Sequence, residues 1–82
     1  MSRYSGRRKP LSDRALFLLR DIVVLSRAEG RAVRAAEVIP DGSPALYNSL
    51  HVLADRWFIV IDGNRIRPRQ IGVQLLRQRG VI

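Results

Sequence analysis

The strongest pattern in the chain is a run of apolar side chains at helical spacing near its start. It predicts a helix from about Asp13 to Glu29. Ser12 offers an oxygen to the free N–H groups of the first turn, and Gly30 is the residue type that most often ends a helix. One stripe of this helix has the spacing of an ordinary core face and holds Ala15, Leu16, Leu19, Ile22 and Val23.

A second apolar stripe lies roughly opposite the first on the same helix. It consists of Phe17, Val24 and Ala28, flanked by Leu18 and Leu25. A helix that is apolar nearly all round must be buried by something. The stripe therefore predicts a symmetric homodimer formed mainly through this helix, with the last helix contributing. In the alternative, the last helix and Val81-Ile82 cover the stripe within one chain.

Two further helices are predicted in the middle of the chain. A short one over about Arg34–Ile39 ends in the turn Pro40-Asp41-Gly42, and Ser43 and Pro44 then open a longer one. One face of the longer helix is apolar and holds Leu46, Leu50, Leu53 and Trp57. Its other face holds Asn48, His51, Val52 and Asp55, so the helix is amphipathic.

From Trp57 onward the pattern changes to that of a β-hairpin followed by a helix. The run WFIVI is aromatic and β-branched, and Asp62-Gly63-Asn64 suits a tight turn. On the returning strand, Arg65-Ile66-Arg67, we expect the isoleucine to point inward and both arginines outward. Pro68 ends that strand, and a last helix runs to about Arg79.

This order of elements is the helix-turn-helix plan extended by a β-hairpin wing. The segment 50–76 (LHVLADRWFIVIDGNRIRPRQIGVQLL) resembles the helix-wing-helix segment of winged-helix repressors of the MarR and PadR kind. The matching residues are Leu50 and Leu53 in the recognition helix, Phe58-Ile59 and Asp62-Gly63-Asn64-Arg65 in the wing, and Gly72 at the opening of the last helix. Trp57 stands at the corner where those families usually have glycine. The resemblance implies a mainly α winged helix-turn-helix with a three-helix core, a wing and a C-terminal helix.

Length and composition bound this interpretation. A chain of 82 residues forms one domain at most, here residues 11–82, and cysteine is absent, so disulfides and thiolate zinc sites are excluded. The longest apolar run, Ala15–Leu19, is far shorter than the roughly 20 residues that cross a bilayer. The basic start leads into a charged helix instead of a signal-peptide core, so we expect a cytoplasmic protein without a membrane partner.

The net charge of +8 predicts a polyanionic partner, and its distribution adds detail. Residues 1–10 carry +4, residues 11–56 are neutral, and residues 57–82 carry +4. The first ten residues have no periodicity, and we predict a flexible basic arm there.

Little in the sequence indicates catalysis. His51 is the sole histidine, and neither a GxSxG elbow nor a phosphate-binding Gly-Lys-Ser/Thr loop is present. We therefore expect no enzyme, no metal site and no cofactor, and no small-molecule ligand is evident.

The outer face of the third predicted helix carries the candidate contacts to DNA bases. They are Ser43, Tyr47, Asn48, Ser49 and His51. Asn48 suits a bidentate contact to adenine, but no Arg or Lys lies between Gly42 and Asp55 to contact guanine. The alternative is that these residues form only a solvated helix face.

The basic residues lie where they would contact the DNA backbone or the minor groove. They are Arg3, Arg7, Arg8 and Lys9 in the arm, Arg31 and Arg34 before the second helix, and Arg65 and Arg67 on the wing. Alternatively, the arm is a solubilising tail and the wing arginines only protect a strand edge from pairing.

Taken together, these features predict a sequence-specific double-stranded DNA-binding protein, a homodimer that acts as a transcriptional repressor. Three other functions stay open at this point. They are an architectural or excisionase-like DNA-binding protein, an RNA-binding module, and a winged helix that serves only protein–protein interaction.

Overall fold

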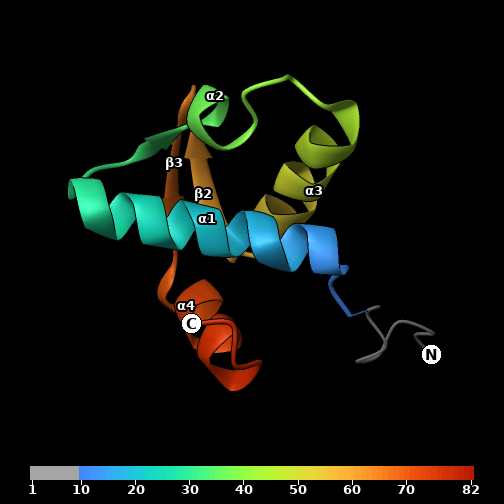
Figure 1. Cartoon of the computed structure of the whole chain (residues 1–82), viewed down its shortest axis with the longest axis vertical. Helices are drawn as coiled ribbons and strands as arrows, with labels where there is room; N and C mark the ends of the chain where they lie inside the picture. Colours follow the sequence, from blue (N-terminus) through green and yellow to red (C-terminus); the bar gives the residue numbers. More distant parts are fainter. Residues whose placement is uncertain (1–9) are drawn as a thin grey trace.

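The chain folds into a mainly helical structure with one small antiparallel sheet (Figure 1). The structure, a computed structural model, describes residues 10–82, so the predicted basic arm lies almost wholly outside the described residues. No helix within residues 10–82 is both long and apolar enough to span a bilayer. The elements are α1 (Asp13–Glu29), β1 (Val33–Arg34), α2 (Ala35–Val38), α3 (Pro44–Asp55), β2 (Ile59–Asp62), β3 (Arg65–Pro68) and α4 (Gln70–Gln78).

Helix α1 has the predicted bounds and is the centre of the fold. The Ser12 hydroxyl accepts a hydrogen bond from the Ala15 N–H at 3.2 Å, and Gly30 ends the helix with φ 65°. Its predicted core stripe is buried throughout. Figure 1 shows α1 crossing in front of the strands, with α2 and the hairpin turn above it and α4 below.

The sheet contains one strand more than the sequence pattern predicted. Its order is β1-β3-β2, and all neighbours are antiparallel. In β1, Val33 pairs with Ile66 of β3, and both side chains are buried against α1. A strand of two residues is too short to show an alternating pattern, which is why the sequence indicated only a link before the second helix. The predicted hairpin of β2 and β3 is confirmed.

Helix α4 packs closely on the corner where β2 begins. The Arg69 N–H donates to the Phe58 carbonyl at 2.9 Å, and a Cβ on Gly72 would lie only 2.6 Å from the same oxygen. Val73 and Leu76 then enter the core beneath α1. Glycine at position 72 thus permits the close approach of α4 to the rest of the fold.

The sequence predicted that Trp57 continues the apolar face of α3, and this prediction is wrong. The helix ends at Asp55, and the Phe58 N–H reaches back to the Leu53 carbonyl at 3.0 Å. This helix ending requires a left-handed residue, and Trp57 takes that conformation with φ 66°. Its side chain is 62% exposed, with the Arg69 guanidinium 5.3 Å from the ring centroid. The prediction failed because Trp57 was assigned to a face by helical spacing, although it lies two residues after the last residue of the helix.

Candidate nucleic-acid interface

The outer face of α3 presents most of the side chains predicted to contact bases. Tyr47, Asn48 and His51 are exposed on this face, and Ser43 is half-buried just before the helix. The opposite face, with Leu50 and Leu53, is buried against α1. The amphipathic character predicted for this helix therefore holds, and its polar face is accessible.

Ser49 is a correction to the predicted set. Its side chain is only 9% exposed, and its hydroxyl donates to the Ala45 carbonyl one turn earlier at 3.2 Å. At helical spacing Ser49 lies at the edge of the face that holds Leu46, Leu50 and Leu53. Its burial could have been inferred from that spacing, and it is not placed to contact a ligand.

A groove separates α3 from the turn of the β2–β3 hairpin. On one side lie Tyr47 and His51 of α3, and on the other lie Gly63 and Asn64 of the turn. Ala35 of α2 closes one part of the groove. Asn64 was not among the predicted contact residues, although its place in a hairpin turn after an amphipathic helix was visible in the sequence. The fold thus brings two segments that are separate in the sequence to one groove.

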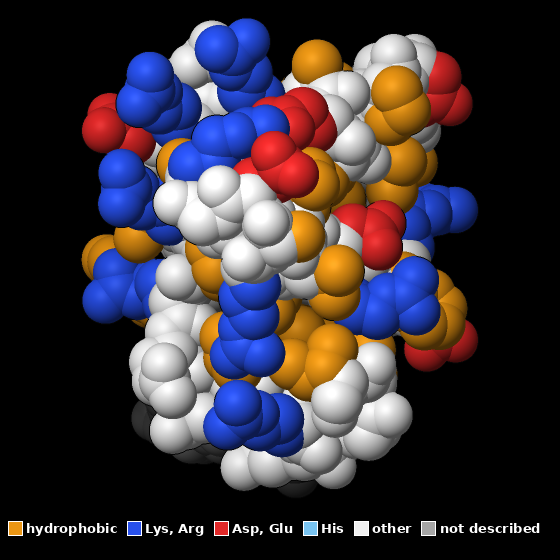
Figure 2. All heavy atoms as spheres, turned by 60° about the vertical axis from the view of Figure 1, so that its left-hand side comes forward, with side chains coloured by type: hydrophobic (Ala, Val, Ile, Leu, Met, Phe, Trp, Pro, Cys, Tyr) orange, Lys and Arg blue, Asp and Glu red, His pale blue; other side chains and the backbone are white. Residues whose placement is uncertain are grey.

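Arginines dominate the outer face of the sheet, which is turned away from α1. Because Val33 and Ile66 point inward as a pair, the adjacent pair Arg34 and Arg65 points outward. Arg67, two residues further along β3, shares this outward face. Figure 2, in which the left-hand side of Figure 1 comes forward, shows basic side chains gathered mainly at its upper left.

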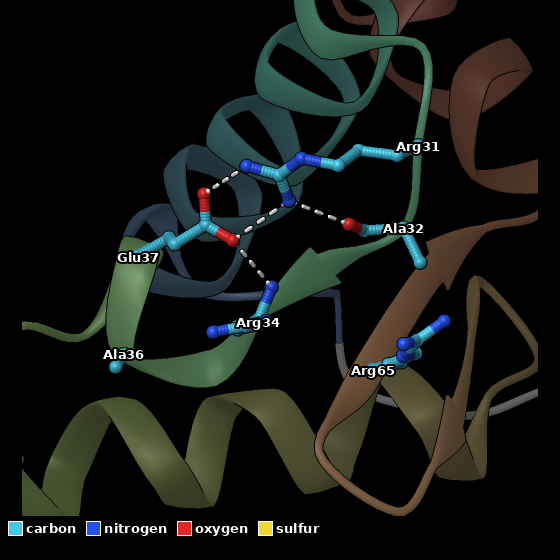
Figure 3. Close-up of a pocket in the computed structure, with 6 residues that line it drawn as sticks. All are labelled: Arg31, Ala32, Arg34, Ala36, Glu37 and Arg65. Carbon is cyan, nitrogen blue, oxygen red and sulfur yellow. Dashed lines mark hydrogen bonds and ion pairs between the residues drawn. The ribbon is translucent and has the colours of Figure 1, made fainter.

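Arg31 is held by an ion-pair network instead of projecting freely (Figure 3). Its guanidinium donates two hydrogen bonds to Glu37, at 2.9 and 2.8 Å, and one to the Ala32 carbonyl at 2.9 Å. Glu37 also accepts from the Arg34 N–H at 2.9 Å. The Arg31 hydrogen bonds, followed by that of Arg34, lower the pKa of Glu37 from 4.5 to about 2.

This network gives Arg31 a structural role, and its contact to DNA stays a prediction. Its charge is offset by Glu37, and it ties the loop after α1 to α2. The side chains of Arg34, Arg65 and Arg67 make no ion pair within residues 10–82. Their charges on this surface are therefore not offset by an ion pair in the described part of the chain. The arm residues Arg3, Arg7, Arg8 and Lys9 lie outside the described residues.

The second apolar stripe of α1 is only partly as predicted. Phe17 and Val24 are 50% and 53% exposed, Ala28 is exposed, and Leu25 is half-buried. Leu18 is 3% exposed inside the core, so its assignment to an open stripe is wrong. Helix α4 contacts the core side of α1, near Leu19, and does not cover Phe17 or Val24.

Comparison with protein-family models, curated proteins and solved structures gives no match. The resemblance to winged-helix repressors therefore stays a prediction.

Proposed function

We propose that this chain is a winged helix-turn-helix protein that binds double-stranded DNA in a sequence-specific manner. The observation that carries the proposal is the common surface of α3 and the hairpin turn, where Tyr47 and His51 face Asn64 across a groove. The element order and the β1-β3-β2 sheet agree with this plan, in which the hairpin is the wing. The resemblance to MarR- and PadR-type repressors supports the same assignment.

Base recognition belongs to α3 in this proposal. An exposed amphipathic helix fits the major groove, and the polar side chains of its outer face reach base edges. Asn48 has the donor and acceptor that pair with adenine, while Tyr47 and His51 can each form a hydrogen bond to a base or a phosphate.

The electrostatic part of the affinity comes from the sheet. Helix α3 contains no Arg or Lys, so it contributes position and readout but little attraction to phosphate. Arg34, Arg65 and Arg67 supply the attraction from beside it, on the outer sheet face. These guanidinium groups would contact phosphates, or the minor groove next to the major groove that holds α3.

Transcriptional repression is the regulatory outcome that we propose. A protein that occupies duplex DNA over a promoter blocks the polymerase by exclusion, without a specific contact to it. Repression therefore needs no surface beyond the DNA-binding one.

Selection of bound fragments from a random duplex pool tests the proposal. The wild type should enrich a defined sequence, and Asn48→Ala should change that sequence or abolish enrichment. The Ser49→Ala variant is the matched control, because Ser49 is buried one position away on the same helix. Enrichment of bendable DNA without a common sequence would replace the proposal by an architectural function. Preference for RNA would indicate an RNA-binding module, and absence of any binding at about 0.1 M salt would favour a protein partner.

A further inference from the structure

The exposed side of α1 is an apolar surface with charges at its centre. Phe17 and Val24 are about half exposed and lie two turns apart on the same face of the helix. Arg20 and Asp21 lie between them and approach each other to 3.5 Å. The Arg20 guanidinium also rests 5.2 Å from the centroid of the Phe17 ring.

Beside Val24 this surface continues into a groove between α1 and α2. Its apolar lining consists of Val24, Leu25 and Ala28 from α1 with Val38 and Pro40 from the α2 side. An aromatic side chain is the kind of group that such a lining accommodates. Phe17 is the exposed aromatic residue of the same face of α1.

We propose that a second copy of this chain docks on this face, with the two α1 helices antiparallel about a twofold axis that passes between residues 20 and 21. In this register Phe17 of each copy lies opposite the partner's Val24 and can enter the groove of the partner. The contact is made twice, because a twofold interface uses the same patch on both subunits.

Charge complementarity favours this register. The twofold axis places Arg20 of each copy level with the partner's Asp21, so four charges of zero net sum meet at the centre. An arginine that lies near two carboxylates, its own and that of the partner, is better compensated than in the single chain. A parallel arrangement would instead set Arg20 beside its own equivalent.

The orientation of α1 in the fold places the candidate DNA-binding elements of both copies at the same end of the dimer. In Figure 1, α1 runs across the strands, with the hairpin turn on one side of it and α4 on the other. A twofold axis perpendicular to α1, in the plane of the contact, keeps both hairpin turns and both α3 helices at the same end. If the proposed function holds, the two copies can meet one duplex, and the preferred site is a palindrome.

The interface is small, so the dimer should be weak and the fraction of dimer should depend on concentration. One helix face and a shallow groove correspond to the low end of specific interfaces, below about 1,200 Å² in total. We expect a monomer–dimer equilibrium without DNA, in which a mass of 9.3 kDa doubles as the concentration rises.

A charge-swap experiment tests the register by sedimentation equilibrium in the absence of DNA. Arg20→Asp gives four acids at the centre and Asp21→Arg gives four bases, so each variant alone should stay monomeric. An equimolar mixture of these two variants should regain dimers, and so should the double variant that carries both changes. DNA is not used, so failure of this test would reject the dimer but not the DNA-binding proposal. Failure to bind DNA would likewise not reject the dimer.

A second variant checks the apolar part. Phe17→Ser with Val24→Ser should abolish dimers while the circular dichroism spectrum stays unchanged, because both side chains are exposed. The unfolding midpoint should also equal that of the wild type at a concentration where the wild type is monomeric, since dimer formation adds stability at higher concentrations. The proposal is overturned if the wild type remains a 9.3 kDa species up to about 1 mM. It is equally overturned if the mixed charge variants form no more dimer than each variant alone.

Discussion

Arg34 of β1 and Arg65 of β3 are direct cross-strand partners, and both point away from the core. Like charges that face each other in an antiparallel sheet are destabilising. Arg65 has Asp62 as its neighbour on β2, but no ion pair between the two forms in the described structure. A bound anion would relieve the repulsion between the two arginines. In the proposed complex, a DNA phosphate supplies this negative charge.

Replacing either arginine of this pair should weaken DNA binding without weakening the fold. For Arg34→Ala and Arg65→Ala we expect lower affinity for every duplex and a salt slope that falls by about one unit for each phosphate that is no longer neutralised. The midpoint of urea unfolding should stay equal or rise. Arg79→Ala removes the same charge just after α4, on the other side of α1 from the hairpin turn, and should leave the salt slope unchanged. Equal effects of all three changes would mean that the cross-strand pair has no special role.

Asn48 and Ser49 are adjacent in sequence but should differ in their effect on DNA recognition. Asn48 is exposed on α3, whereas the Ser49 hydroxyl is committed to the Ala45 carbonyl. Asn48→Ala should reduce discrimination between the selected site and a random duplex by about 1–3 kcal/mol. Ser49→Ala should leave it unchanged. Competition binding against random DNA measures the difference, and equal loss on both duplexes would show that α3 does not distinguish bases.

The elements with strong local features could be predicted from the sequence. Helix α1 has a cap at Ser12, a terminator at Gly30 and a core stripe between them, and its observed bounds agree with the prediction. The hairpin could be predicted for the same reason, since β-branched residues and a tight turn at Gly63 occur together. Local chemistry alone decides where such elements begin and end.

Features that depend on contacts between distant residues could not be predicted. Strand β1 exists because Val33 pairs with Ile66, more than thirty residues later, so the pairing of Arg34 with Arg65 was also invisible in the sequence. The bond from Arg31 to Glu37 depends on how the loop after α1 folds back toward α2. Leu18 was assigned to the wrong face because its spacing on the helix does not show how widely the core surrounds α1.

Glu37 should make stability depend on pH in the acidic range. Its pKa in the folded chain is about 2, below the ordinary value of 4.5, so the ionised form stabilises the fold. This stabilisation is fully present above pH 4.5 and is lost as the pH falls toward about 2. The wild type should therefore unfold at a higher urea concentration than Glu37→Gln at neutral pH, and the gap should narrow as the pH falls from 4.5 to 2.

Glu29→Gln is the control for this experiment. The Glu29 carboxylate approaches Arg31 only to 3.8 Å, beyond hydrogen-bonding distance, so its loss should have a smaller effect at neutral pH. A gap between wild type and Glu37→Gln that does not depend on pH would assign the loss to something other than the carboxylate charge.

At position 57, a glycine variant should be more stable than an alanine variant, which reverses the usual order of stability. At most positions alanine stabilises relative to glycine, by about 0.4–1 kcal/mol, because it restricts the unfolded chain. At φ 66° a Cβ is unfavourable, and a left-handed conformation costs a non-glycine residue roughly 1–2 kcal/mol. Trp57→Gly should therefore be more stable than Trp57→Ala, although both variants lack the ring that faces the Arg69 guanidinium. Urea unfolding followed by circular dichroism measures this difference, since both variants lack the sole tryptophan. If the alanine variant is equal or more stable, the corner after α3 does not hold residue 57 in the left-handed conformation.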